Sequence, residues 1–290
     1  MRGIIFVLGF LWSGGFLMCA DTRYEEPRIV CLGGAVTEIV YALGYGEHIV
    51  GVDQTSLYPP EATKLAQVGY VRQLSTEGIL GLNPTLILAI GDAGPPDVMK
   101  QLESAGVDLL VLDAPLSYEG IQEKLTVIAD KIGAEKKRAE LTHELEETRK
   151  RLLQQVEDVQ AKQQSRILFL MHHGGGQWAG AGTGTAADAL IALVGGENVL
   201  NGLHGYKTLS TEAMAGVDVD YVFVGERSLG SMGGFDRANL PIWWPKSSSG
   251  ENAELLVVNE LEALGFGLRT LSAALQIAEQ LQLSGKLSQK

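Results

Sequence analysis

Cysteine is almost absent from this chain of 290 residues, which contains only Cys19 and Cys31. Cys19 lies in an apolar segment at the N-terminus, so a freely soluble processed chain keeps Cys31 alone and cannot form an internal disulfide. Cys31 stands in the apolar stretch 28–32, where a cysteine usually behaves as a small hydrophobic side chain. We therefore expect a buried, unpaired thiol at this position.

Basic residues are also scarce. Lys and Arg total 23 against 35 Asp and Glu, which gives a net charge of −12 and a pI of about 4.9. A protein that binds nucleic acid needs clustered Lys and Arg to neutralise phosphates, so the composition argues against nucleic acid as a partner. The 46% of hydrophobic residues and 20% of charged residues are typical of globular domains, and the length suffices for two.

A long uninterrupted apolar run is missing even at the N-terminus. Residues 1–20 carry one positive charge at Arg2 and an apolar stretch that is broken around Gly14 and short for a membrane span. This pattern predicts a secretory signal peptide, and its removal leaves an exported chain with a net charge of −13. A lipid anchor at Cys19 stays open, although Met18 is a poor small-residue substitute directly before a lipoprotein cysteine.

Apolar strand-like runs alternate with helical patterns in both halves of the chain. The predicted strands are 28–32, 48–52, 85–90, 108–114, 166–173, 220–226 and 254–259, and the predicted helices are 35–44, 95–106, 118–132, 185–195 and 269–283. Such alternation is typical of βα units around a parallel sheet that is covered on both faces. The sequence therefore predicts two Rossmann-like α/β lobes with parallel-rich sheets.

Residues 134–164 contain neither Gly nor Pro. Apolar side chains recur there at spacings of four, seven, four and three, at Leu141, Leu145, Leu152, Val156 and Val159. One amphipathic helix of about thirty residues, roughly 45 Å long, is the expected structure. We expect this helix to join the lobes as a stiff strut. A dimerisation coiled coil is the weaker alternative, because the stripe covers little more than two heptads.

The expected organisation follows from these patterns. The chain divides into a signal peptide at 1–20, an N-terminal α/β lobe at 21–133, the interlobe helix at 134–164 and a C-terminal α/β lobe at 165–290. Two lobes joined by a helix leave a cleft between them, and such clefts commonly bind small ligands.

The tetrapeptide LSTE occurs twice, at 74–77 and 209–212, each time after a tyrosine, Tyr70 or Tyr206, and before a predicted strand. One residue fewer separates the tyrosine from the leucine in the second copy. The segments ALGYGEHIVG from Ala42 and ALVGGENVLNG from Ala192 form a second similar pair in the same order. We infer an internal duplication, which gives the molecule two similar lobes.

Each LSTE copy places a serine and a glutamate at the start of a helix. Ser75 and Ser210 can cap the helix, and Glu77 and Glu212 favour the positive end of its dipole. One acid on each lobe, related by a pseudo-two-fold axis, suits docking on a symmetric dimeric partner with basic pockets.

Tyr70 precedes Arg72 by two residues. In an extended stretch, side chains two residues apart share one face, so the phenol would lie beside the guanidinium. A tyrosine near a permanent positive charge loses its proton more easily, and a phenolate is an anionic oxygen ligand suited to ferric iron. A surface tyrosine packed on an arginine is the alternative, and the spacing alone favours it.

His172 and His173 are neighbours at the end of a predicted strand, directly before three glycines at 174–176. Neighbouring strand residues point to opposite faces, so the pair is not expected to chelate one ion. The glycines would let a large flat ligand approach the backbone closely. A zinc site is disfavoured, because no third His or Cys lies at metal-ligand spacing.

Several of these motifs together resemble one family. They are GYVRQLSTEGIL at 69–80, HGGGQWAGAGTGTAADALIALVGG at 173–196, GYKTLSTEAM at 205–214, SMGGFD at 231–236 and LGFGLRT at 264–270. Over nearly the whole exported chain, the sequence is similar to the periplasmic haem-binding proteins of bacterial haem ABC importers. Those belong to a group of helix-linked binding proteins that also carry cobalamin and ferric siderophores.

The resemblance implies a role for each candidate residue. Tyr70 would be the axial ligand of the haem iron, with Arg72 stabilising it, and His173 would supply a second ligand from the opposite lobe. Because two histidines stand where one is expected, His172 remains the alternative to His173. Arg227 is a candidate partner for a haem propionate.

The implied function is an exported monomer that captures iron(III) haem b and delivers it to a dimeric ABC permease without catalysing a reaction. Glu77 and Glu212 match the acids that pair with the permease. A cobalamin or ferric-siderophore carrier of the same fold is the first alternative, although a siderophore would need more cationic residues than Arg72 and Arg227. An exported metalloenzyme using the two histidines is the second. Trp243 and Trp244 lie outside the family pattern and would line the cleft or pack in the core.

Overall fold

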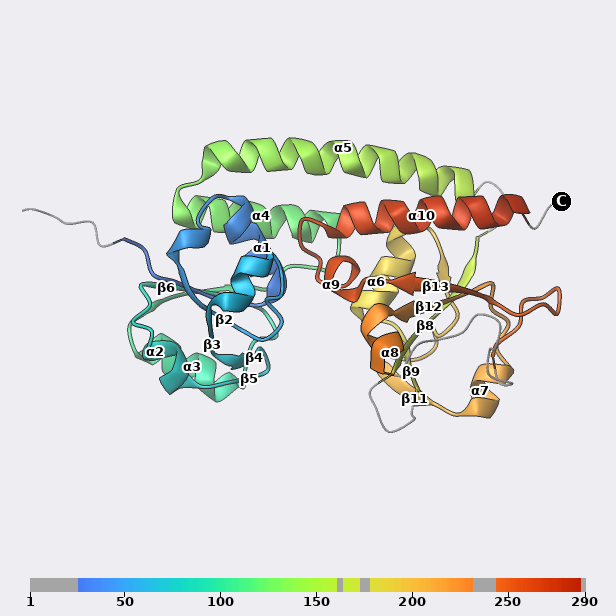
Figure 1. The fold of residues 1–290 in the computed structure, drawn as a ribbon, viewed down its shortest axis with the longest axis horizontal. Helices are drawn as coiled ribbons and strands as arrows, with labels where there is room; N and C mark the ends of the chain where they lie inside the picture. Colours follow the sequence, from blue (N-terminus) through green and yellow to red (C-terminus); the bar gives the residue numbers. More distant parts are fainter. Residues whose placement is uncertain (1–25, 161–163, 173–177, 232–243, 288–290) are drawn as a thin grey trace, which may run out of the picture.

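The computed structural model describes residues 26–160, 164–172, 178–231 and 244–287. Two α/β lobes lie side by side, and one long helix runs along the same side of both (Figure 1). The predicted fold class is therefore confirmed. Within the described ranges, no helix combines the length and apolar character needed to cross a membrane.

A five-stranded parallel sheet of order β3-β2-β1-β6-β7 forms the first lobe. Its strands are β1 (Ile29–Leu32), β2 (Ile49–Val52), β3 (Ala66–Gln67), β6 (Leu86–Ile90) and β7 (Asp108–Leu112). Its helices are α1 (Gly34–Ala42), α2 (Thr76–Leu80), α3 (Pro96–Ser104) and α4 (Tyr118–Ile132), with the 3-10 turns η1 (Gly46–His48) and η2 (Pro60–Lys64).

Alternate residues of β1 enter two different cores. Cys31 packs in the cluster that contains residues of α1 and α4, whereas Val30 packs with Ile79 of α2 and Leu102 of α3. This alternation follows from the pleat of a strand, whose successive side chains point to opposite faces. Helices therefore cover both faces of the sheet, and the prediction of a buried thiol at Cys31 is confirmed.

The second lobe has a six-stranded sheet with the main order β11-β9-β8-β12-β13, and β10 pairs with β8. Its strands are β8 (Arg166–His172), β9 (Trp178–Ala181), β10 (Glu197–Asn198), β11 (Tyr206–Leu209), β12 (Tyr221–Gly225) and β13 (Glu254–Val258). Its shorter helices are α6 (Ala186–Leu193), α7 (Thr211–Ala215), α8 (Glu226–Ser231) and α9 (Glu260–Ala263). The strands β8, β10, β12 and β13 are parallel, whereas β9 and β11 form antiparallel pairs that the sequence analysis did not predict.

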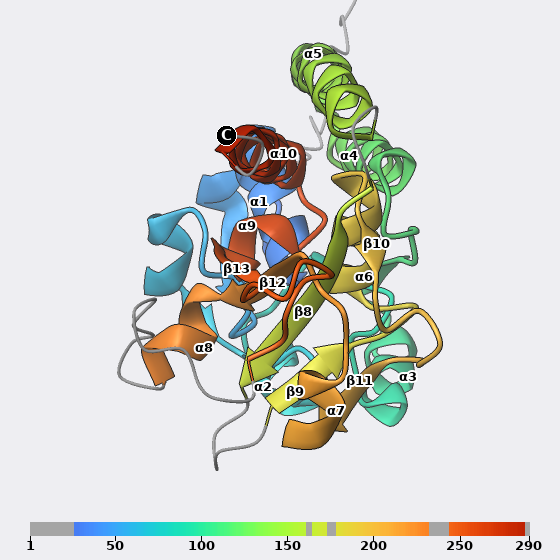
Figure 2. The same ribbon diagram turned by 90° about the vertical axis from the view of Figure 1, so that its right-hand side faces the viewer.

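The long helix α5 (Glu135–Gln160) packs along α10 (Thr270–Leu287) and against α4. Figure 2 shows α5 and α10 at the same end of the molecule, with α2 and α7 at the other. Leu145 and Leu152 of α5 are buried, so the apolar stripe is used inside this chain. Residues 161–163 of the predicted helix lie outside the described ranges.

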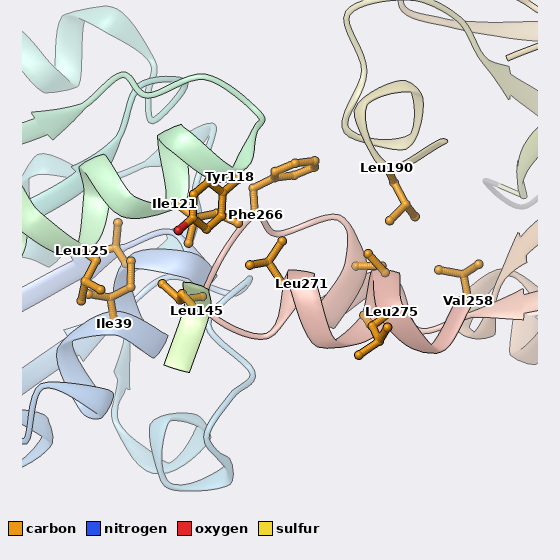
Figure 3. Packing of buried hydrophobic residues seen from close by; sticks show 14 of the residues in the cluster. Ile39, Tyr118, Ile121, Leu125, Leu145, Leu190, Val258, Phe266, Leu271 and Leu275 are labelled. Carbon is orange, nitrogen blue, oxygen red and sulfur yellow. The ribbon is translucent and has the colours of Figure 1, made fainter. Parts of the chain in front are cut away.

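One continuous hydrophobic core connects the two lobes beneath these helices. It includes Ile39 and Leu125 from the first lobe, Leu190 from the second and Leu271 from α10 (Figure 3). The lobes therefore share buried apolar surface, which favours a single rigid arrangement over two domains on a free linker.

Arg269, just before α10, ties the second lobe to the first by polar contacts. Its backbone N–H and its Nε donate to the Glu38 carboxylate at 2.8 and 2.9 Å, and its Nη1 donates to Glu262 at 2.8 Å. The guanidinium also stacks 3.6 Å from the centroid of the Tyr58 ring. Charge-assisted hydrogen bonds to a largely buried carboxylate hold their geometry well, so this contact should limit movement between the lobes.

Candidate functional site

A cavity of about 640 Å³ lies between the lobes, a size typical of small-molecule sites. The first lobe contributes the segments that follow β6 and β7, at the carboxyl ends of its parallel strands, where α/β sheets commonly bind ligands. Its wall also includes Gly184–Ala186 and Tyr206 from the second lobe, and parts of the segment 260–269.

Tyr70 and Arg72 lie on a hairpin at the edge of this cavity. The strands β4 (Gly69–Tyr70) and β5 (Gln73–Leu74) pair in antiparallel fashion, which leaves Val71 and Arg72 in the turn. The stretch is therefore not extended, and the geometric premise for the pair is wrong. The turn nevertheless brings the side chains together, because Nη1 of Arg72 donates to the Tyr70 hydroxyl at 2.7 Å.

Arg72 is held in place by a second contact, an ion pair with the Asp92 carboxylate in the loop after β6. Burial opposes its positive charge, but Asp92 and the Tyr70 hydroxyl outweigh that effect and raise the pKa of Arg72. Val71 and Arg72 line the cavity, while Tyr70 is 38% exposed beside it. The phenol therefore sits at the rim of the cleft with a fixed cation on its oxygen.

Tyr206 lies on the opposite wall, at the start of β11. Burial raises the pKa of Tyr206, although contacts with the Thr185 side chain, the Ala187 N–H group and the charge of Arg72 act in the other direction. The sequence analysis did not nominate Tyr206 as a site residue. Its matched position in the two LSTE copies was the signal that could have identified it.

His172 and Arg227 are not among the described residues that line the cavity. His172 ends β8, where its ring lies 5.2 Å from that of Trp178, edge to face, and its backbone N–H donates to the Ser228 hydroxyl at 3.1 Å. His173 lies outside the described residues. Arg227 is exposed in the first turn of α8, a segment predicted as a loop, and like Tyr70 it is not among the described residues that line the cavity.

The two LSTE copies form matched helix starts. Ser75 accepts a hydrogen bond from the third residue of α2, and Ser210 does the same in α7, so both predicted caps are confirmed. Glu77 and Glu212 are exposed, and Figure 1 shows α2 and α7 on the side of the molecule away from α5. The Glu212 backbone N–H and the Ser210 hydroxyl lower the pKa of Glu212. Docking of a permease on these acids stays a prediction.

Trp244 is buried, and its indole N–H donates to the Ala253 carbonyl at 2.8 Å. It packs with Leu168 and Val222 in the core of the second lobe. Of the two alternatives for this residue, packing is therefore the one observed. Trp243 lies outside the described residues.

Solved structures of two periplasmic heme-binding proteins are similar to this chain. The periplasmic heme-binding protein RhuT from Roseiflexus sp. RS-1 is 34% identical and superposes with a TM-score of 0.77, covering 89% of this chain and 98% of that one. The periplasmic heme-binding protein BhuT, solved with two hemes, is 33% identical with the same TM-score and covers 88% of this chain and 97% of its own.

A vitamin B12-binding protein from Pectobacterium carotovorum is 38% identical over 103 residues, which is 36% of this chain. The alignment spans only 37% of that curated relative. The family model described as "Periplasmic binding protein" matches residues 29–239, which is most of the chain. The chain therefore belongs to the periplasmic binding protein family, whose members work outside the cytoplasm.

Proposed function

We propose that the protein captures iron(III) haem b in the cleft between its lobes and delivers it to the permease of an ABC importer. The observation that carries this proposal is the 2.7 Å hydrogen bond from Arg72 to the Tyr70 hydroxyl at the edge of the cavity. A guanidinium donor stabilises a phenolate, and a phenolate is a ligand that ferric haem accepts. The heme-binding proteins at 33 and 34% identity support the same class of ligand.

Other residues complete the proposed binding mode. His173 would supply a second iron ligand, a role less suited to His172 because the ring of His172 packs against Trp178. Arg227 would contact a haem propionate from α8. Because Arg269 and the shared core hold the lobes together, binding should involve only modest closure of the cleft.

The proposal includes the route to and from the site. Residues 1–20 would direct export, with a lipid anchor at Cys19 as the alternative to a freely diffusing periplasmic monomer. Glu77 and Glu212 would dock the loaded protein on a dimeric permease. Their exposure on one side of the molecule suits a contact with two basic pockets.

Replacement of Tyr70 by Phe tests the ligand assignment. The purified protein should give a tyrosinate-type ferric spectrum when titrated with hemin. Tyr70→Phe should abolish that signature and lower the affinity by more than ~100-fold, since even residues that only support a metal ligand are worth 10- to 100-fold. Tyr45→Phe is a matched control, because the Tyr45 ring lies 5.4 Å from that of His48. None of residues 43–47 is among the described residues that line the cavity, whereas Val71 and Arg72 beside Tyr70 are.

A Tyr70→Phe variant with unchanged affinity and spectrum would refute the assignment. Failure of the unmodified protein to bind hemin at all would refute the function itself. Circular dichroism of each variant checks that the fold is retained.

Cobalamin is the second candidate, because several curated relatives are named vitamin B12-binding proteins. Calorimetric titration with cyanocobalamin, followed by displacement with hemin, separates the two. The haem proposal expects hemin to bind at least ~100-fold more tightly, a difference of roughly 2.7 kcal/mol. The opposite order would assign the cleft to a corrinoid.

A further inference from the structure

Lys124 is a lysine buried in the wall of the cleft. It lies in the middle of α4, is 5% exposed and lines the same cavity as Arg72 and Tyr206. Lysine is almost never this deeply buried unless its ammonium group is paired. The burial of this charged side chain therefore needs a physical reason other than packing.

Among the described residues that line the cavity, the other two cations are paired, whereas Lys124 is not. Arg72 forms an ion pair with Asp92, and Arg269 forms one with Glu38. Across the described ranges, the Lys124 ammonium makes no hydrogen bond or ion pair, and the one charged group that acts on it is the exposed carboxylate of Glu123. Its nitrogen is also not among the fully enclosed side-chain atoms that lack a partner, so it keeps some open access.

Burial lowers the pKa of Lys124 to about 8, so the side chain is still mainly an ammonium ion at neutral pH. A charge that has lost water without gaining a counter-ion attracts an anion strongly, because the surroundings screen it poorly. A carboxylate supplies the missing charge and accepts the ammonium protons. An occupant of the cavity that carries carboxylates would therefore complete this site.

We propose that Lys124 binds a carboxylate of the ligand, namely one propionate of the porphyrin, an inference that rests on the proposed haem-binding function. The iron lies at the centre of the macrocycle and the propionates lie on its edge. One ligand can thus contact the Tyr70 hairpin through its iron and α4 through its edge. The two contacts come from different parts of the first lobe, because Lys124 lies on α4 and Tyr70 on the β4–β5 hairpin, and Figure 1 shows these elements at opposite sides of that lobe.

A comparison of two ligands and three proteins tests this assignment. Hemin and its dimethyl ester share the iron and the ring, but the ester has no free carboxylate. Both are titrated, in the same mixed solvent, into the unmodified protein, Lys124→Met and Lys131→Met. Lys131 is a matched control on the same helix, where it pairs with Asp108.

Lys124→Met should weaken hemin binding by ~10-fold, the effect of one charge-assisted contact, and change ester binding less than about twofold. Lys131→Met should leave both affinities unchanged. Equal losses for hemin and ester, or no loss for hemin, would overturn the assignment, and Lys124→Gln serves as a second variant with a polar side chain. If the unmodified protein binds neither ligand, the proposed function fails, which is a distinguishable outcome.

Discussion

Tyr70 and Tyr206 occupy matched positions in the two lobes, yet their phenols have different surroundings. Tyr70 accepts a hydrogen bond from a guanidinium at the rim of the cleft. Tyr206 contacts the Thr185 side chain and the Ala187 N–H group at the start of α6. The first phenol therefore has a cation on its oxygen, while the second has neutral partners. The two similar sequence segments therefore hold their tyrosines in different contacts.

One residue accounts for this difference. In the first lobe an extra residue stands between the tyrosine and the leucine of LSTE, which allows a two-residue turn that ends at Arg72. In the second lobe the shorter segment runs as the continuous strand β11 from Tyr206 to Leu209, paired with β9. The residue two positions after Tyr206 is Thr208, which has no cationic group to donate to the Tyr206 hydroxyl as Arg72 does to that of Tyr70.

The described cations that line the cleft also differ between the two lobes. Arg72 and Lys124 both come from the first lobe. Arg269 belongs to the second part of the chain, but its guanidinium is held by Glu38 and Glu262. Within the described part of the cleft, the first lobe therefore carries the groups that can receive an anionic or metal-bearing ligand.

The largest predicted effect is on the free energy of unfolding, which the buried charge of Lys124 in the first lobe lowers. Burial lowers the pKa of Lys124 from 10.5 to about 8. Below pH 8 this lysine is protonated in both the folded and the unfolded state, so burying its charge makes the ligand-free folded protein less stable. Lys124→Met should therefore raise the free energy of unfolding at pH 7, by up to about 3 kcal/mol. Urea denaturation of both proteins measures the difference.

The sign of the pH dependence follows from the lowered pKa. Between pH 8 and 10.5 the unfolded chain binds the proton that the folded chain has lost, so the unmodified protein gains stability relative to Lys124→Met as the pH rises. Within the described ranges, the one charged group that acts on Lys124 is Glu123, and it is the same in both proteins. A constant difference from pH 7 to 10.5 would contradict the prediction. Lys131→Met should show no such change.

Ser75 and Ser210 cap the matched helices α2 and α7 and can be replaced one at a time. Ser75 accepts from Gly78 N at 3.3 Å and Ser210 accepts from Ala213 N at 3.1 Å, so replacing either by Ala should cost about 1 kcal/mol of stability. Their effects on hemin should differ, because Ser75 directly follows the hairpin that carries Tyr70. Ser75→Ala should weaken binding severalfold, whereas Ser210→Ala should not. Equal effects of both on binding would contradict the assignment of the ligand to the first lobe.

The sequence was sufficient for the features that depend on local pattern. Apolar runs predicted the longer parallel strands of both sheets but not the two-residue strand β3, the absence of Gly and Pro predicted α5, and Ser75 and Ser210 predicted the caps. The spacing of Tyr70 and Arg72 predicted their contact, although the responsible geometry is a turn and not an extended stretch.

Features created by folding could not be predicted in this way. Lys124 appears in the sequence as one more charged residue of a helix, and only the packing of α4 between α1 and α5 buries it. The bond between Arg269 and Glu38 joins residues 231 positions apart and has no local signature. The strands β9 and β11 were missed because Gly and short polar segments weaken a strand pattern that the sheet itself stabilises.

Tyr206→Phe should have the smallest effect and gives the sharpest comparison with Tyr70→Phe. It removes a hydroxyl that already contacts Thr185 and Ala187 and leaves the hairpin untouched. Hemin affinity should stay within about threefold, or ~0.7 kcal/mol, and the tyrosinate-type spectrum should persist. If Tyr206→Phe lost that spectrum while Tyr70→Phe kept it, the iron ligand would belong to the second lobe. Loss of the spectrum in both variants would mean that the two phenols act together, because the field of Arg72 reaches each of them.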